Sequence, residues 1–176
     1  MNKINDRAAM IEAAAAKMGK KTFVDDLKKV GTPRLEYQKT CSKVVTLEEA
    51  IRQSGLKDGM TISFHHHFRG GDKVVNMVVA KLAEMGFKNL HIAASSLQDV
   101  HKPLIEHIRN GVVNRLSTSG LRGELANEIS HGLMDEPVVF RSHGDRASAI
   151  KRGDLHIDVA FLGASSCDPL GNAAGY

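Results

Sequence analysis

Short apolar runs alternate with longer amphipathic segments from residue 57 to residue 162, and this alternation limits what the chain can fold into. Strands separated by helices of about ten residues form parallel sheets, because each helix carries the chain back to the starting edge. We therefore expect an α/β fold with a parallel-rich sheet flanked by helices. The expected strands are 60–64, 89–93, 112–116, 137–141 and 157–162, and the expected helices are 72–85, 102–110, 123–131 and 145–152.

Residues 1–56 differ from this body and predict a helical N-terminal arm. Residues 6–18 favour helix by composition, and Gly19 follows as a stop signal. The stretch 20–45 is charged and irregular. Thr46 and Glu49 have the spacing of a capping box, which predicts a short helix beginning at residue 47. The α/β domain is then expected over residues 57–176.

Composition excludes several functional classes. The chain has 176 residues, enough for one domain with a core, and a net charge of +4 with charges of both signs mixed along it. Because the charges are mixed, no basic face for nucleic acid is indicated. Because the chain has no Trp and few aromatic residues, no stacking platform for bases is indicated either. No apolar run reaches transmembrane length. Two distant cysteines favour a reducing compartment, and we expect a cytoplasmic protein without membrane contact.

The segment Ile-Ser-Phe-His-His-His-Phe-Arg-Gly-Gly-Asp, residues 62–72, predicts an anion site. It places a strand, a basic loop and a helix start in series. Gly70 and Gly71 allow backbone N–H groups to approach a ligand closely, at the positive end of the following helix. Arg69 adds a cation that can bind a carboxylate or phosphate through two parallel hydrogen bonds.

Small, hydroxyl and glycine residues also follow each of the remaining expected strands. They include Ala94-Ser95-Ser96, Ser117-Thr118-Ser119-Gly120, Ser142-His143-Gly144 and the run from Gly163 to Asp168. Ligands of open α/β sheets bind at the carboxyl ends of the strands. The sequence therefore predicts one site, shared among several loops at that edge.

The histidines and cysteines have simpler interpretations than metal binding or nucleophilic catalysis. Neighbouring residues on an extended segment point to alternate sides, so His65 and His67 could share a side while His66 could not. We therefore expect no metal here and favour hydrogen bonding to a polar substrate or to the loop. His91 and His156 are expected in strands as half-buried structural residues, and Cys167 as a small packing residue.

Several motifs together resemble one family. They are Ser-Phe-His-His-His-Phe-Arg-Gly-Gly-Asp at 63–72, Gly-Glu-Leu-Ala at 123–126, Val-Val-Phe-Arg-Ser-His-Gly at 138–144 and Ile-Asp-Val-Ala-Phe-Leu-Gly-Ala-Ser-Ser-Cys-Asp at 157–168. The chain resembles the alpha subunit of citrate lyase over nearly its whole length. The turn Asp168 to Asn172 is also similar to the Asp-x-x-Gly-Asn turn of CoA-transferases in general.

The resemblance implies a CoA-transferase-like fold, of the type shared with sugar-phosphate isomerases, and a transferase activity. In that family the alpha subunit exchanges acetyl for citrate on a thiol prosthetic group, a phosphoribosyl-dephospho-CoA. The acyl carrier gamma subunit bears this group, and the beta subunit cleaves the citryl thioester to oxaloacetate and acetyl thioester. The implied partners are therefore citrate, acetyl and citryl thioesters and these two subunits, with a homo-oligomer expected. Citramalate stays open as an alternative substrate.

The resemblance and the residues together give a set of binding candidates, with no catalytic nucleophile named. These are His65, His67, Arg69, Gly70, Gly71, Arg141, His143, Gly163, Ser165, Ser166, Asp168, Gly171 and Asn172. Family members are considerably longer, with a second α/β half, so the resemblance implies that this chain alone is inactive. Two other functions stay open: a non-catalytic truncated assembly module of the lyase complex, and a domain related to sugar-phosphate isomerases.

Overall fold

The computed structural model of the chain describes residues 13, 14, 16, 17, 42–65 and 71–174. The chain divides into two compact units, residues 1–39 and 40–176. Most of the helix expected over 6–18 lies outside the described residues, but those described within it are helical.

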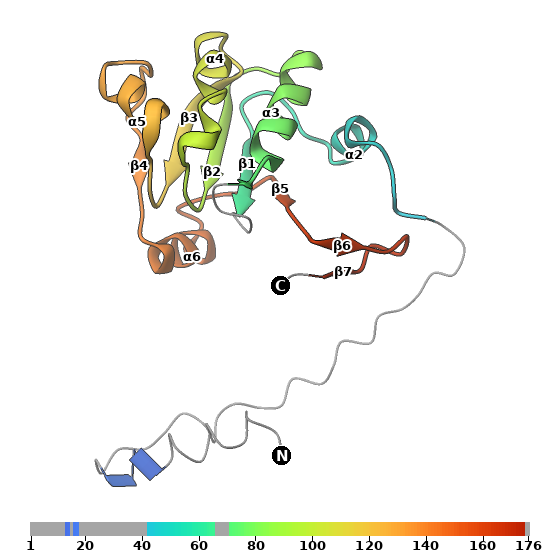
Figure 1. Cartoon of the computed structure of the whole chain (residues 1–176), viewed down its shortest axis with the longest axis vertical. Coiled ribbons are helices and arrows are strands. Elements are labelled where there is room, and N and C mark those ends of the chain that lie inside the picture. The colour runs from blue at the N-terminus through green and yellow to red at the C-terminus, as the bar shows by residue number, and fades with distance from the viewer. Residues whose placement is uncertain (1–12, 15, 18–41, 66–70, 175–176) are drawn as a thin grey trace. The chain divides into compact units, whose positions relative to one another are not determined.

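A five-stranded parallel sheet forms the centre of the second unit (Figure 1). The strand order is β4-β3-β2-β1-β5, and each neighbouring pair is parallel. The predicted α/β fold with a parallel sheet is therefore confirmed. The strands are β1 (Thr61–His65), β2 (Leu90–Ala94), β3 (Val113–Thr118), β4 (Val139–Phe140) and β5 (Val159–Leu162).

Helices connect these strands at the positions that the alternation predicts. The first crossovers use α3, η3 with α4, and α5, while α6 leads from β4 to β5, the strand on the far side of β1. An additional helix, α2, precedes β1. The helices are α2 (Leu47–Gln53), α3 (Val74–Glu84), the 3₁₀ helix η3 (Asp99–His101), α4 (Leu104–Arg109), α5 (Gly123–Ser130) and α6 (His143–Arg152).

Side-chain caps fix where two of the helices begin. Thr46 Oγ1 accepts a hydrogen bond of 3.2 Å from Glu49 N, which confirms the predicted start of α2. Ser142 Oγ accepts one of 3.0 Å from Asp145 N, so α6 begins at His143 instead of the expected residue 145. Such caps satisfy backbone N–H groups that have no partner within the helix, and each is worth about 1 kcal/mol.

The larger core cluster lies between one face of the sheet and helices α2 to α5. Ile62 and Phe64 of β1 and Ile92 of β2 pack there against Val78 and Leu82 of α3, and all five are at most 1% exposed. Full burial of each such side chain stabilises the fold by about 1.5–3 kcal/mol. These residues therefore hold the sheet and the helical layer together.

The opposite face of the sheet is more polar and carries α6. Only a small apolar cluster forms there among the described residues, in which Ala93 packs with Ala149 and Leu155. His91 lies in β2 two residues before Ala93 and bonds to hydroxyl groups of both neighbouring strands. The sheet is thus apolar toward α2–α5 and partly polar toward α6.

The edge strand β4 departs from expectation. It spans Val139–Phe140 rather than 137–141, and its residues are exposed. Pro137 has no N–H group to contribute to a ladder, and an edge strand has only one neighbour. After β5, the chain forms the antiparallel pair β6 (Ser166–Cys167) and β7 (Ala173–Ala174).

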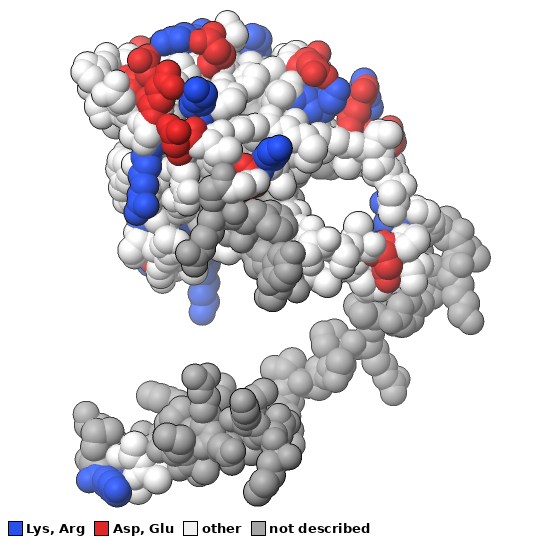
Figure 2. Space-filling view, in the orientation of Figure 1, with Lys and Arg blue, Asp and Glu red and all other residues white. Residues whose placement is uncertain are grey.

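Acidic and basic side chains are interspersed over the helical part of the surface drawn in Figure 2. Several are paired within or between helices, as in Arg52 with Glu48 and Arg109 with Glu106 and Glu128. Among the described residues, none of the helices has the length and apolar character needed to cross a bilayer.

Candidate functional site

The carboxyl ends of all five strands meet at one edge of the sheet, because the strands are parallel. His65 at the end of β1 is the register partner of Leu162 at the end of β5. From β1 the chain continues to β2, β3 and β4 on one side of β1, and from β4 it returns to β5 on the other side of β1. Open α/β sheets bind ligands at such a reversal of strand order. The pair β1–β5 is therefore where a site is expected.

The loop after β1 is only partly described. His67, Arg69 and Gly70, which the sequence predicts as binding residues, lie outside the described residues. His65 and Gly71 flank them, and both are exposed. The predicted anion site of this loop therefore stays a prediction, with its two ends placed at the carboxyl edge and before α3.

The exit of β5 leads directly into the β6–β7 hairpin. Gly163 is half-buried and follows the last residue of β5. The Ser165 hydroxyl donates a hydrogen bond of 2.9 Å to Ala174 O, and its N–H donates to the same oxygen. Ser166 is exposed, and its hydroxyl has no hydrogen-bond partner among the described residues. Ser166 is therefore the serine of this pair whose hydroxyl can turn to a ligand.

The predicted residues Asp168, Gly171 and Asn172 build the turn between β6 and β7. Asp168 Oδ1 accepts from Leu170 N and Asn172 N, each at 2.9 Å, and Oδ2 accepts from Asn172 Nδ2 at 2.7 Å. The Asn172 side chain, followed by backbone N–H groups, holds the pKa of the Asp168 carboxyl below its usual value. Gly171 has a φ of 86°, which favours glycine. The Asp168 carboxylate is thus engaged within its own turn.

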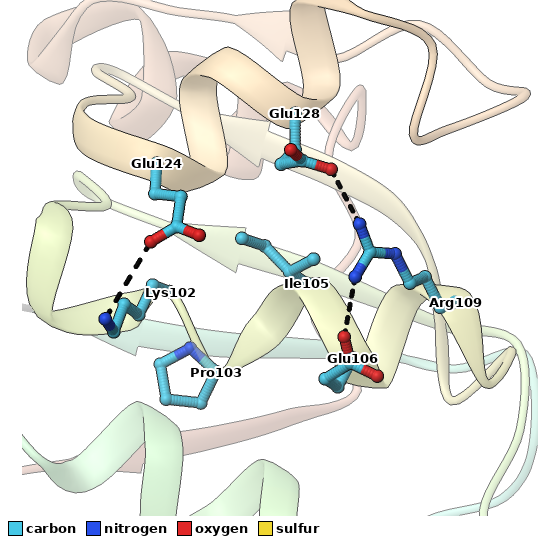
Figure 3. A pocket seen from close by; sticks show the side chains of 7 residues that line it. All are labelled: Lys102, Pro103, Ile105, Glu106, Arg109, Glu124 and Glu128. Carbon is cyan, nitrogen blue, oxygen red and sulfur yellow. Dashed lines mark hydrogen bonds and ion pairs between the residues drawn. The ribbon is translucent and has the colours of Figure 1, made fainter.

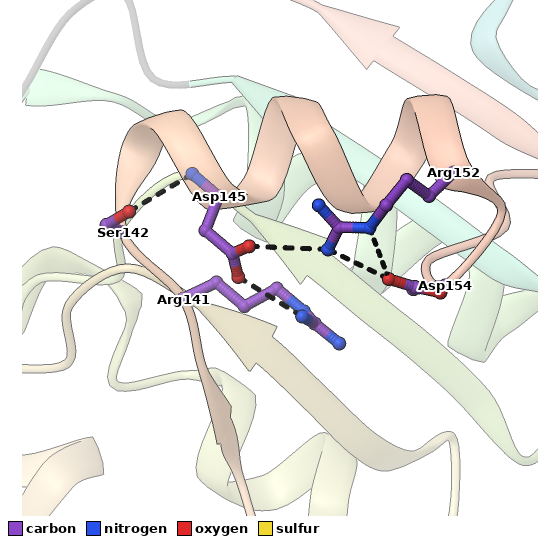
Figure 4. Close-up of polar contacts among 5 residues, drawn as sticks. All are labelled: Arg141, Ser142, Asp145, Arg152 and Asp154. Atoms are coloured by element: carbon purple, nitrogen blue, oxygen red, sulfur yellow. Dashed lines mark hydrogen bonds and ion pairs between the residues drawn. The ribbon is translucent and has the colours of Figure 1, made fainter.

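Arg141 is already paired within the described residues. Its Nη1 lies 3.2 Å from Asp145 Oδ2, while Arg152 Nη2 lies 3.5 Å from Asp145 Oδ1 (Figure 4). Arg152 also contacts Asp154 at 2.8 Å. Two arginines and two carboxylates therefore balance each other in this cluster. An anion that binds Arg141 would have to compete with Asp145.

Arg141 and His143 also lie some distance along the edge from His65. They leave β4, which is separated from β1 by β3 and β2. Three strand spacings amount to about 14 Å. The structure brings His65 and Gly163 together at the β1–β5 pair, but it leaves Arg141 and the exposed His143 at the other end of the edge.

Arg146 of α6 is a residue that the sequence analysis missed. Its Nη2 donates to Ser63 Oγ at 2.7 Å and to Ala93 O at 3.1 Å, near the carboxyl ends of β1 and β2. The side chain is half-buried, and burial lowers the pKa of its guanidinium. No sequence motif marks this residue. The only available signal was its place one turn inside a helix that follows a strand exit.

His91 fulfils its predicted structural role, whereas His156 does not. His91 is half-buried in β2, with Nε2 2.8 Å from Ser117 Oγ and Nδ1 3.3 Å from Thr61 Oγ1. Burial, followed by the charge of Arg115, lowers its pKa to about 4. His156 lies before β5, not in it, and is exposed beside Asp158. The strand begins at Val159, two residues later than expected, and the preceding Asp158 accepts a hydrogen bond of 2.8 Å from Thr61 N through its Oδ2.

Neither Cys167 nor any cluster of ligating side chains among the described residues has the surroundings of a metal site. Cys167 lies in β6 and is exposed, so the prediction that it is a packing residue is wrong for the described structure. No group of three or more His, Cys, Asp or Glu within the described residues could hold a metal ion. His66 and His67 lie outside them, and the expected absence of a metal therefore stays a prediction.

Two pockets on the described residues include none of the predicted site residues in their lining. One of about 280 Å³ lies between α4 and α5, where Lys102 pairs with Glu124 and Arg109 with Glu106 and Glu128 (Figure 3). The other, of about 420 Å³, includes Asn89 and Gly111, which precede β2 and β3. Charges in the first are mutually satisfied, and the second lies at the amino ends of the strands. Neither coincides with the predicted site.

Comparison with known proteins gives a consistent result. Residues 39–176 match the family described as "Citrate lyase, alpha subunit (CitF)". The chain is 65% identical over 131 residues to the citrate lyase alpha chain of Haemophilus influenzae, covering 74% of this chain and 26% of that protein. It is 60% identical over 152 residues to the Escherichia coli citrate lyase alpha chain, covering 82% and 29%, and 66% identical over 131 residues to that of Klebsiella pneumoniae, covering 74% and 26%.

A solved structure from Streptococcus mutans, described as the alpha subunit of citrate lyase in complex with citrate, superposes with a TM-score of 0.74 at 55% identity. The match covers 77% of this chain and 27% of that one. The chain thus spans 26–29% of the length of the curated relatives it matches. The family match extends over more than three quarters of the chain. The chain belongs to the citrate lyase alpha subunit family.

Proposed function

We propose that this chain belongs to a transferase that forms citryl thioester from citrate. The reaction exchanges acyl groups: acetyl thioester and citrate give citryl thioester and acetate. The thioester bond to the acetyl group breaks, and a thioester bond to a citrate carboxyl forms. The oxygen that this carboxyl loses leaves as part of acetate. The observation that carries this proposal is the 55% identity to a solved structure described as bound to citrate, combined with a polar carboxyl edge of the sheet.

The residues at the β1–β5 pair suit such a substrate. Citrate brings three carboxylates, and the described residues near this edge include the half-buried Arg146 and the exposed Ser166. A hydroxyl or backbone N–H group near a thioester can stabilise the negative charge that develops on its oxygen. Ser166 and the N–H of Gly163 are the candidates for this task among the described residues.

We propose further that the thiol is supplied by a partner subunit. The resemblance implies a phosphoribosyl-dephospho-CoA group on an acyl carrier, and its thiol would supply the sulfur that exchanges acyl groups. The group carries phosphates, which require cations or free N–H groups. The polar, exposed exits at His65, Gly71 and Ser166 fit an extended group that enters from outside the domain. On this proposal the fold is of the CoA-transferase type, within a complex that also contains the lyase beta subunit.

A reconstitution experiment tests this function. A full-length alpha subunit that contains this sequence is combined with acetylated acyl carrier and with radiolabelled citrate. Citrate-dependent release of acetate, with label appearing on the carrier, is the expected result. Omission of citrate is the control for simple thioester hydrolysis. Release of acetate without citryl carrier would contradict the proposal.

A further inference from the structure

Arg146 bridges the helix α6 and the sheet at the predicted site. Its Nη2 donates to Ser63 Oγ at 2.7 Å and to Ala93 O at 3.1 Å. Ser63 is the register partner of Ala160 in β5 as well as of Ala93 in β2. The guanidinium group therefore lies over β1, one strand from β5 and two residues before His65.

The charge of Arg146 is uncompensated among the described residues. Arg141 and Arg152 share Asp145, and Arg152 also has Asp154. Arg146 makes no ion pair with a described carboxylate, and its two partners are a hydroxyl and a carbonyl oxygen. Asp145 is its neighbour in sequence, yet the Asp145 carboxylate is turned to the other two arginines (Figure 4). Among the described residues, Arg146 is thus a half-buried arginine of α6 without a carboxylate partner, whereas Arg152 of the same helix is paired.

The environment of this cation is costly without an anion. Arg146 is half-buried, and its Nε is buried without a hydrogen-bond partner in the described structure. Burial alone lowers the pKa of its guanidinium, which reports the same desolvation. A buried charged group usually has an opposite charge beside it, because desolvation otherwise disfavours it. A role restricted to tying α6 to the sheet would be served by an uncharged donor.

We propose that Arg146 binds a carboxylate of the acyl acceptor and that Ser63 positions its guanidinium for this contact. The inference rests on the proposed function, since it assigns a residue to the tricarboxylate of that reaction. A carboxylate is favoured over a phosphate because one partly engaged guanidinium matches one negative charge. A phosphate dianion would call for further cations, which the described residues around Arg146 lack.

Calorimetric titration of citrate into the purified chain and its variants tests the proposal. Arg146→Gln should weaken citrate binding about ten- to hundredfold, the effect of losing one charge-assisted hydrogen bond. Glutamine removes the charge and keeps an NH₂ donor, although on a shorter side chain. Arg152→Gln is the matched control: it removes an arginine of the same helix that is already paired, and citrate binding should be unchanged.

Two further variants separate binding from folding. Arg146→Lys keeps the charge and should bind citrate better than Arg146→Gln, though less well than the unmodified chain. Ser63→Ala should weaken citrate binding severalfold, and Ser63→Thr should restore it, because the hydroxyl positions the guanidinium. Thermal unfolding of every variant is recorded in parallel. A fall in citrate affinity that follows only the midpoint temperature would overturn the proposal.

Titrations with citrate, with other di- and tricarboxylates and with inorganic phosphate distinguish the proposal from the function on which it rests. If the chain binds citrate and Arg146→Gln binds it equally well, the inference fails and the proposed function stands. If the chain prefers another di- or tricarboxylate and Arg146→Gln loses that affinity, the citrate function fails and the inference stands. Inorganic phosphate that displaces citrate from the unmodified chain but not from Arg146→Gln would reassign Arg146 to a phosphate and overturn it.

Discussion

Gly123 lies so close to Asp99 that a Cβ atom added at Gly123 would be 2.8 Å from Asp99 Cα. The contact joins the first residue of α5 to η3, and Glu124 N donates to Asp99 Oδ1 at 3.3 Å across it. Gly123 also has a φ of 71°, a conformation that other residues rarely adopt. The glycine is thus required for two independent reasons, one steric and one conformational.

Gly123→Ala should therefore destabilise the chain by about 2–5 kcal/mol, the sum of left-handed strain and overpacking against backbone. Gly132→Ala is the matched control, because Gly132 has a φ of 92° but nothing within 4 Å of an added Cβ. It should cost only the conformational part, about 1–2 kcal/mol. Urea unfolding measures both. Equal losses of unfolding free energy in the two variants would show that the contact with Asp99 does not contribute to the destabilisation.

His91 should make the chain less stable in acid. Its pKa is lowered to about 4 in the folded chain, from an ordinary value of 6.5. Folding thus favours the neutral ring, so the contribution is complete above pH 6.5 and is lost as the pH falls toward 4. Because the side chain is only half-buried, solvent screening reduces the effect to about 1–2 kcal/mol.

The check compares the free energy of unfolding at several pH values between 7 and 4 in the unmodified chain and in His91→Gln. Glutamine does not titrate, so its curve should be flatter over this interval. His156→Gln, an exposed histidine, should keep the steeper dependence. A His91→Gln curve parallel to that of the unmodified chain would remove His91 as the cause.

Periodic features of the sequence predicted most of the fold. The strands β1, β2 and β3 and the helices α3, α4 and α5 lie within one to two residues of their expected bounds. Their apolar residues repeat at strand or helix spacing, which is a local property. The place of β5 beside β1 depends on contacts between residues far apart in sequence, such as Thr61 with Asp158, and the pattern does not contain it.

The candidate site was predictable only in its location. Polar strand exits indicate the carboxyl edge, because parallel strands all end there. Arg146 was missed because it belongs to none of the motifs and its partner Ser63 is 83 positions away in the chain. Arg141 was chosen for its strand exit, but its carboxylate partner lies four residues later on a helix whose start was expected too late.

Asp168 should control the β6–β7 turn. Its carboxylate accepts hydrogen bonds from Leu170 N, Asn172 N and Asn172 Nδ2. Asp168→Asn keeps the shape but replaces one acceptor oxygen with an NH₂ group that faces another donor. Amide exchange at Ser165 and Gly171, whose N–H groups are bonded within the hairpin, should accelerate severalfold. Asp154→Asn, which removes an exposed ion-pair partner of Arg152, is the control and should leave this exchange unchanged.

The same turn should respond to pH in a defined direction. The lowered pKa of Asp168 means that the folded turn favours the carboxylate. Its contribution is therefore complete above the ordinary value of 3.8 and is lost as the pH falls through the lower folded value. Protection of the hairpin amides that already disappears between pH 7 and pH 5 would contradict this account.

The polypeptide of 176 residues should bind carboxylates weakly and should not exchange acyl groups by itself. It spans 26–29% of the length of the relatives it matches, so most of a relative's chain has no counterpart here. The carboxyl edge is open at His65, Gly71 and Ser166, which are all exposed. Rapid acyl transfer requires both partners to be held in one orientation, and an open edge cannot restrain a thioester and citrate together.

The measurement is acetate release from acetylated acyl carrier with citrate present, for this polypeptide and for the full-length Escherichia coli alpha chain, to which it is 60% identical. We expect exchange only with the longer chain. Citrate binding by the short polypeptide, measured separately, shows that it is folded and that the loss lies in catalysis. Exchange at comparable rates by the short polypeptide would show that the β1–β5 edge is sufficient for the reaction.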